Sequence, residues 1–163
     1  MKKVLMIAAL MLSISLIISG AAYAATATAT LDVSVSVGAA CTVQTTPVDF
    51  GQYDNQRVDV FADITVTCPT GIPYAIALDA GQNYDGRYRG ISNGPDRLYY
   101  ILFDPFGYEW GDVGYGDAYP DGSIVSGTGD GTPQSHDVLA ELPGQGYFAD
   151  GVYSDTVGVT VYY

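Results

Sequence analysis

A strict two-residue alternation runs from Ala25 to Val43 and constrains this chain more than any other feature. Every odd position holds an apolar residue and, up to Ser36, every even position is Thr, Asp or Ser. A period of two predicts an extended strand with one buried face. Strands usually have about 3 to 10 residues, whereas this pattern lasts 19 residues and would span about 65 Å. One small domain cannot cover such a strand, so part of it is expected to pair elsewhere.

The first 24 residues have the three parts of a secretory signal. Lys2 and Lys3 precede an apolar run from Val4 to Ile18, and Ala22-Tyr23-Ala24 has the A-x-A form of a cleavage site. An uncleaved anchor is less favoured, because the run is shorter than the roughly 18 residues that span a bilayer. Cleavage after Ala24 leaves 139 residues, the size of one domain.

The chain beyond this signal is strongly acidic. Four arginines, at positions 57, 87, 89 and 97, stand against 18 acidic residues, which gives a formal charge of −14. Such a surface repels nucleic acid and anionic lipid, so neither nucleic-acid binding nor membrane insertion is expected. Solubility outside the cell is the simplest interpretation of this charge.

Cys41 and Cys68 are the two cysteines of the chain. In an exported protein such a pair predicts a disulfide, which would constrain the unfolded chain by about 3 to 4 kcal/mol. A metal site at these residues is not expected, because no further cysteine and a single histidine are present. We likewise expect no cofactor.

Period-two segments recur along the chain, separated by turn residues, and helical periodicity is absent after the signal. This pattern predicts an all-β sandwich or barrel. The Gly- and Asp-rich stretch 104–133 is expected to be a long surface excursion with one short strand near residues 123–125. The other expected strands lie at 58–68, 73–81, 97–105, 136–144 and 151–163.

The last of these segments alternates as strictly as the first. Val157, Val159 and Val161 share one face, and Thr156 and Thr160 lie on the other. The sequence stops at Tyr163 with no following strand to pair with this one, so an apolar edge is expected to stay open.

Two groups of residues have the composition of catalytic sites. In Ser135-His136-Asp137 neighbouring side chains of a strand point to opposite faces, so a nucleophilic triad is not expected. Glu109 and Asp112 could serve as the acid and base of a glycosidase, but chance pairing is common among so many carboxylates. We therefore expect no enzyme.

Calcium and sugar binding are two further alternatives in the stretch 104–133. Four aspartates offer the oxygen ligands that calcium prefers, although their spacing does not match an EF-hand loop. Trp110 and three tyrosines could stack against sugars, but packing under the loop or onto a neighbouring subunit is favoured. The four aspartates are Asp112, Asp117, Asp121 and Asp130, and the three tyrosines are Tyr108, Tyr115 and Tyr119.

Several motifs together resemble one protein family. They are GAACTV, VDFGQYD, DITVTCPTGIPYAIALDAG, YYILFD followed by WGD, and GVYSDTVGVTVYY. This combination resembles the spore coat protein U domain family, which includes secreted pilus subunits of archaic (Csu-type) chaperone-usher systems. The resemblance covers essentially all of the chain beyond the signal. DVGYGDAYPDGS is longer than the family pattern, and HDVLAELPG replaces a Tyr-Gly-Arg-like segment.

The resemblance implies an incomplete immunoglobulin-like β-sandwich that lacks its last strand and receives a donor strand from a neighbouring subunit. A periplasmic chaperone and an outer-membrane usher would be its partners, and the product would be a homopolymer, a cell-surface fimbrium for adhesion or biofilm. The implied organisation is a signal peptide at 1–24, a donor extension at 25–36 and a domain at 37–163. Donor side chains would be Ala27, Ala29, Leu31, Val33 and Val35, and the acceptor groove would be bordered by Val157, Val159 and Val161.

The alternative is a self-contained exported binding or surface-coat module, for example one that binds sugar. Its early alternation would be only its own first strand with a flexible tail. Such a module should purify as a stable monomer, whereas a pilus subunit alone should aggregate, polymerise or be degraded.

Overall fold

The computed structural model describes residues 32, 34, 38, 40–116, 118–119 and 122–163. The chain divides into two compact units, Met1–Ser36 and Val37–Tyr163, and every strand lies in the second. The predicted signal peptide and the predicted donor side chains at positions 27, 29, 31, 33 and 35 lie outside the described residues.

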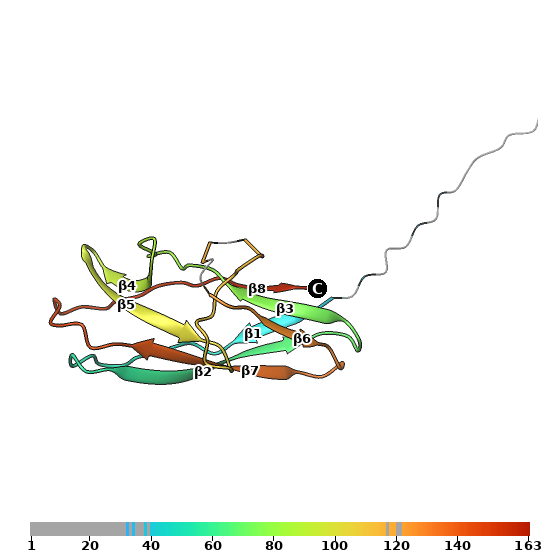
Figure 1. Ribbon diagram of the computed structural model, residues 1–163, viewed down its shortest axis with the longest axis horizontal. Coiled ribbons are helices and arrows are strands. Elements are labelled where there is room, and N and C mark those ends of the chain that lie inside the picture. The colour runs from blue at the N-terminus through green and yellow to red at the C-terminus, as the bar shows by residue number, and fades with distance from the viewer. Residues whose placement is uncertain (1–31, 33, 35–37, 39, 117, 120–121) are drawn as a thin grey trace, which may run out of the picture. The chain divides into compact units, whose positions relative to one another are not determined.

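Eight strands in the described residues form two antiparallel sheets, and no described residue is helical, so the all-β prediction is confirmed. In Figure 1, β3 and β8 of the smaller sheet lie above β2 and β7 of the larger one. The larger sheet has the order β1 (Thr42–Thr45), β2 (Val58–Thr67), β7 (Gln134–Leu142), β5 (Asp96–Phe103), β4 (Arg89–Asn93). The smaller sheet has the order β6 (Val125–Thr128), β3 (Pro73–Leu78), β8 (Val159–Tyr162). Nothing in the described ranges forms a helix that is long and apolar enough to cross a membrane.

The hydrophobic core lies between the two sheets. Alternate residues of β2 and β7 are buried there because one face of an antiparallel sheet packs inward and the other meets water. β2 and β7 pair along nine residues, so their inward positions form rows such as Ala62 beside Val138. The smaller sheet closes the core with Tyr74, Ile76 and Leu78 of β3.

The stretch 104–133 contributes to the core and is more than the surface excursion that the sequence predicted. Trp110 is fully buried, and its indole nitrogen donates a hydrogen bond to the carbonyl oxygen of Ile76 at 3.1 Å. The carboxylates of Asp104 and Asp112 are buried as well, and they accept backbone N–H groups of this stretch. Buried acceptors of this kind let an irregular loop pack without unpaired backbone donors.

A disulfide joins Cys41, just before β1, to Cys68, just after β2. Their Cα atoms are 4.3 Å apart, and Cys68 is buried. This covalent bond holds β1, a four-residue edge strand, against β2. It therefore fixes the place where the chain enters the sandwich.

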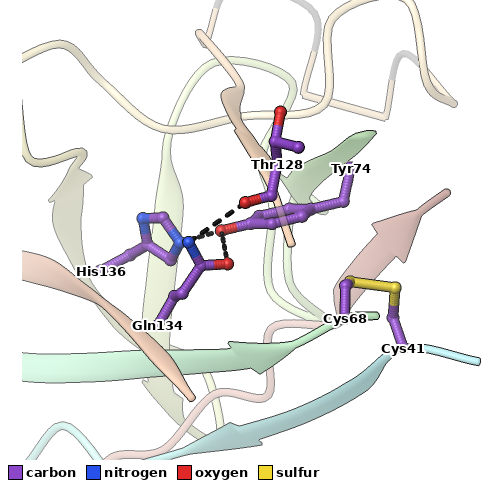
Figure 2. Close-up of a disulfide and its surroundings, with 6 residues drawn as sticks. All are labelled: Cys41, Cys68, Tyr74, Thr128, Gln134 and His136. Carbon is purple, nitrogen blue, oxygen red and sulfur yellow. Dashed lines mark hydrogen bonds between the residues drawn. A yellow bond between two sulfur atoms is a disulfide. The ribbon is translucent and has the colours of Figure 1, made fainter. Parts of the chain in front are cut away.

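A polar cluster lies beside the disulfide and links the two sheets (Figure 2). The Tyr74 hydroxyl donates to the side-chain oxygen of Gln134 at 3.2 Å and lies 2.9 Å from Nε2 of His136. The amide nitrogen of Gln134 donates in turn to the carbonyl oxygen of Thr128 at 3.2 Å. The cluster joins β3, β6 and β7.

Burial lowers the pKa of His136 below its ordinary value of about 6.5, and Asp137 opposes this effect more weakly. The unfolded chain therefore binds a proton before the folded chain does as pH falls. We predict that lowering the pH from 8 to 5.5 reduces the free energy of unfolding more in the wild type than in His136→Gln, by less than about 1 kcal/mol. Urea unfolding at the two pH values measures this difference, and equal losses in both proteins would contradict it.

Candidate functional site

A groove of ≈ 880 Å³ opens between the two sheets. Inward-facing side chains of β2, β5 and β7 line it from the larger sheet, and Leu78, Val157 and Val159 line it from the other side. The sequence predicted that Val157 and Val159 border a groove, but it did not indicate which residues of β2, β5 and β7 lie along it. The inward-facing residues of these three strands are Ala62, Ile64, Leu98, Tyr100, Leu102, Val138 and Leu142.

Two irregular segments, 45–55 and 146–155, form the rim of this groove. Four of their aromatic side chains are partly buried and pack against the core: Phe50, Tyr53, Phe148 and Tyr153. Tyr147, in contrast, is 94% exposed, and Val152 is 87% exposed. Large apolar groups that stay in water beside an apolar groove are typical of a surface that binds another chain.

β8 lies at the edge of the smaller sheet, and within the described residues its one strand partner is β3. Thr45, the last residue of β1, and Val159, the first of β8, both line the groove. The groove therefore reaches β1 and β8, an edge strand of each sheet. Along such an edge, N–H and C=O groups are left available to a further strand.

The three predicted groove valines do not all occupy the same surroundings. Val157 and Val159 line the groove, whereas Val161 packs against the core beyond it. Val161 lies opposite Ile76 of β3 and is half-buried, like Val159, while Thr160 and Tyr162 are exposed. The predicted alternation of faces thus holds along β8.

Asp79, directly after β3, fixes the start of β8. Its backbone N–H donates to the carbonyl oxygen of Gly158 at 3.0 Å, and its carboxylate accepts the N–H of Gly158 at 2.8 Å. A side chain at position 158 would meet the other carboxylate oxygen, because a Cβ there would lie 2.5 Å from it. Glycine is therefore needed for this close approach.

Asp155 fixes the segment that leads into β8. One of its carboxylate oxygens accepts the hydroxyl of Tyr100, a groove residue, at 2.7 Å, and the other accepts backbone N–H groups of Gln82 and Asn83. Burial and this hydrogen bond raise the pKa of Tyr100 well above its ordinary range. The hydroxyl thus stays protonated and donates to Asp155 at physiological pH.

A buried cation, Arg89 of β4, holds the end of β3 in place. Its guanidinium donates to the carbonyl oxygens of Leu78 at 3.0 Å, Asp79 at 2.6 and 2.8 Å, and Trp110 at 2.7 Å. The guanidinium carbon also lies 4.0 Å from the ring centroid of Tyr119. Burial lowers the pKa of Arg89, and the partial charges of the carbonyl oxygens compensate its charge. Arg89 thereby ties the wall of the groove at Leu78 to the loop that carries Trp110.

The residues considered for catalysis do not assemble. Ser135 donates to Asp63 at 3.1 Å on the outer face, whereas His136 points inward to Tyr74. Glu109 accepts the hydroxyl of Tyr119, and Asp112 is occupied by backbone N–H groups. Each of these groups thus has a structural contact.

Neither the aspartates considered for calcium nor the aromatic side chains considered for sugar form a common site in the described residues. Asp117 and Asp121 lie outside the described residues, Asp112 organises its own loop, and Asp130 accepts from Thr132. No cluster of three or more His, Cys, Asp or Glu suited to a metal ion is present among the described residues. The proposed aromatic platform is divided: Trp110 and Tyr119 are buried, Tyr115 packs against Tyr162, and Tyr108 is exposed.

These observations define a class: an all-β sandwich with an open apolar groove that reaches an edge strand. The chain matches the family model of the Spore Coat Protein U domain over residues 27–160, and it therefore belongs to that family. A search among curated proteins found no match.

Among solved structures, the chain is similar to a chain in the crystal structure of the CsuC-CsuE chaperone-tip adhesion subunit pre-assembly complex from archaic chaperone-usher Csu pili of Acinetobacter baumannii. The TM-score is 0.58 at 21% sequence identity. The match covers 78% of this chain and 40% of that chain. This likeness supports the predicted immunoglobulin-like fold.

We predict that Arg89→Met lowers the free energy of unfolding by about 3 kcal/mol, because it leaves buried carbonyl groups without a donor. Arg87→Met is the matched control, since Arg87 is exposed and only stacks on Tyr88. It should change stability by less than about 0.5 kcal/mol. Urea unfolding followed by the fluorescence of Trp110, the single tryptophan, measures both. Equal effects of the two substitutions would show that Arg89 does not have this role.

Proposed function

We propose that this chain is a structural subunit of a chaperone-usher pilus and that it polymerises by donor-strand complementation into an extracellular adhesive or biofilm-related fibre. The observation that carries the proposal is the apolar groove beside the unpaired edge of β8. Membership in the Spore Coat Protein U domain family supports it. So does the fold shared with a chain of the Csu complex, which is a chaperone-tip adhesion subunit pre-assembly complex.

In this proposal a strand from another copy enters the groove and pairs with β8. Residues 25–36 supply it, because their apolar side chains recur at every second position. Such an added strand gains main-chain hydrogen bonds along the edge and buries alternate side chains in the groove. Leu31, Val33 and Val35 would each contribute about 1.5 to 3 kcal/mol by burial, before the cost of ordering the segment. The smaller Ala27 and Ala29 would fill the remaining positions.

The proposed route follows from the need to protect the groove before assembly. A periplasmic chaperone would cover it with a strand of its own, and an outer-membrane usher would pass the subunit to the cell surface. The signal peptide 1–24 would be removed, 25–36 would become the donor, and 37–163 would be the acceptor domain. In this role the chain has no catalytic function.

We predict that Val33→Asp prevents polymerisation, because an unpaired carboxylate would enter an apolar groove. Ser34→Asp is the matched control: it adds the same charge one residue later, on the opposite face of an extended strand. Light scattering after size-exclusion chromatography in 0.5 M sodium chloride measures assembly, since salt at this level screens exposed charges. The wild type and Ser34→Asp should form polymers, and Val33→Asp should not.

Two results would contradict the proposal. One is polymerisation of Val33→Asp at the wild-type rate. The other is a stable monomer that unfolds cooperatively after residues 25–36 are deleted, which would favour a self-contained binding module.

A further inference from the structure

The described residues that line the groove carry negative charge and include no lysine or arginine. Asp49, Asp54 and Asp150 are exposed along its rim, and Asp155 is half-buried within it. No lysine or arginine is among the described residues that line it. An apolar cleft bordered by charge of one sign concentrates the electric field and attracts ligands of the opposite sign.

The arginines of the domain are all engaged elsewhere. Arg57 pairs with Asp59 and Glu141, and Arg97 pairs with Asp85. Arg87 stacks on Tyr88, and Arg89 is buried against carbonyl oxygens. The two lysines of the chain are in the predicted signal, and the one histidine is directed toward Tyr74. A compensating charge at the groove must therefore come from whatever binds there.

The chain's own segment 25–36 has the wrong charge for this groove. When its odd positions insert, its even positions face outward, toward the rim and solvent. These even positions are Thr, Ser and one charged residue, Asp32. Insertion of this segment would bring a further carboxylate to a rim that already has three exposed ones.

We propose that the groove selects by charge, and that a partner segment with Lys or Arg at its outward-facing positions enters it faster than the chain's own segment 25–36. This inference rests on the proposed function, because it concerns the same groove as a strand acceptor. Charge complementarity acts mainly on the rate of association and is screened by salt. A cationic partner strand would therefore bind first at low ionic strength, and insertion of the chain's own segment would be accelerated by salt.

The test compares three labelled peptides of residues 25–36: the natural sequence, one with Asp32→Asn and one with Asp32→Lys. The acceptor is the full mature chain with Val33→Asp, which keeps its groove and is expected not to act as a donor. Fluorescence anisotropy measures the association rates at pH 7.5 in 20 mM and in 500 mM sodium chloride. At low salt the Lys peptide should bind about ten-fold faster than the natural one, with the Asn peptide between them. At high salt the three rates should agree within about two-fold.

A second acceptor variant tests whether the aspartates at the rim cause the preference for the Lys peptide. Asp49→Asn with Asp150→Asn removes two rim charges and should reduce the low-salt preference for the Lys peptide to about three-fold or less. Asp130→Asn with Asp137→Asn is the matched control, because it changes the net charge equally at exposed residues that do not line the groove. The control should keep the full preference.

The outcomes separate this inference from the proposed function. Binding of all three peptides at equal rates at both salt concentrations would contradict selection by charge. It would still support the proposal that the groove accepts a strand. Faster binding of the natural peptide at low salt would also contradict selection by charge. If no peptide binds at any salt concentration, the groove is not a strand acceptor and the proposed function fails as well.

Discussion

β8 pairs with another strand on one side only, and the rest of the domain depends on this constraint. In the described residues it pairs with β3, and its free edge lies beside the groove. A closed sandwich would cover the inner faces of β2, β5 and β7 with a further strand at this position. Here those faces border an apolar opening of ≈ 880 Å³. The cost of leaving such a surface in water is what would drive a segment of another chain into it.

The groove is held open by rigid contacts around it. Arg89 ties the end of β3 to the loop of Trp110, Asp79 ties β3 to the start of β8, and the disulfide holds β1 to β2. Arg89 and Cys68 are buried, and Asp79 bonds both backbone groups of Gly158, so these contacts fix the walls around the groove. A preformed groove of this kind binds a strand with less ordering cost than a flexible one. In the proposed assembly, its acidic rim would add a preference for the charge of the incoming strand.

The strands with clear alternation were predicted from the sequence to within a few residues. β2, β3, β5 and β7 lie within or close to the expected ranges, because the strand period and the turn residues are both local signals. β4 was not predicted, since Arg-Gly-Ile-Ser-Asn has no alternation and forms a strand by pairing with β5. β8 is shorter than expected, because the chain before it is held by Asp79 and Asp155 instead of by strand pairing. Packing of Trp110 was favoured from the sequence, and Trp110 is buried. Its place in the core between the sheets was not predicted, because its loop is rich in Gly and Asp, which usually mark exposed turns.

The sequence by itself determined which side chains of each strand are apolar, that two cysteines could pair, and that the domain carries a large negative charge. Only the tertiary structure decided where the interior stays open, that Val157 and Val159 border the groove while Val161 does not, and that no arginine is among the described residues that line it. The reason is physical. Alternation is a property of neighbouring residues, whereas the covering of an apolar face depends on which distant segments pack against it.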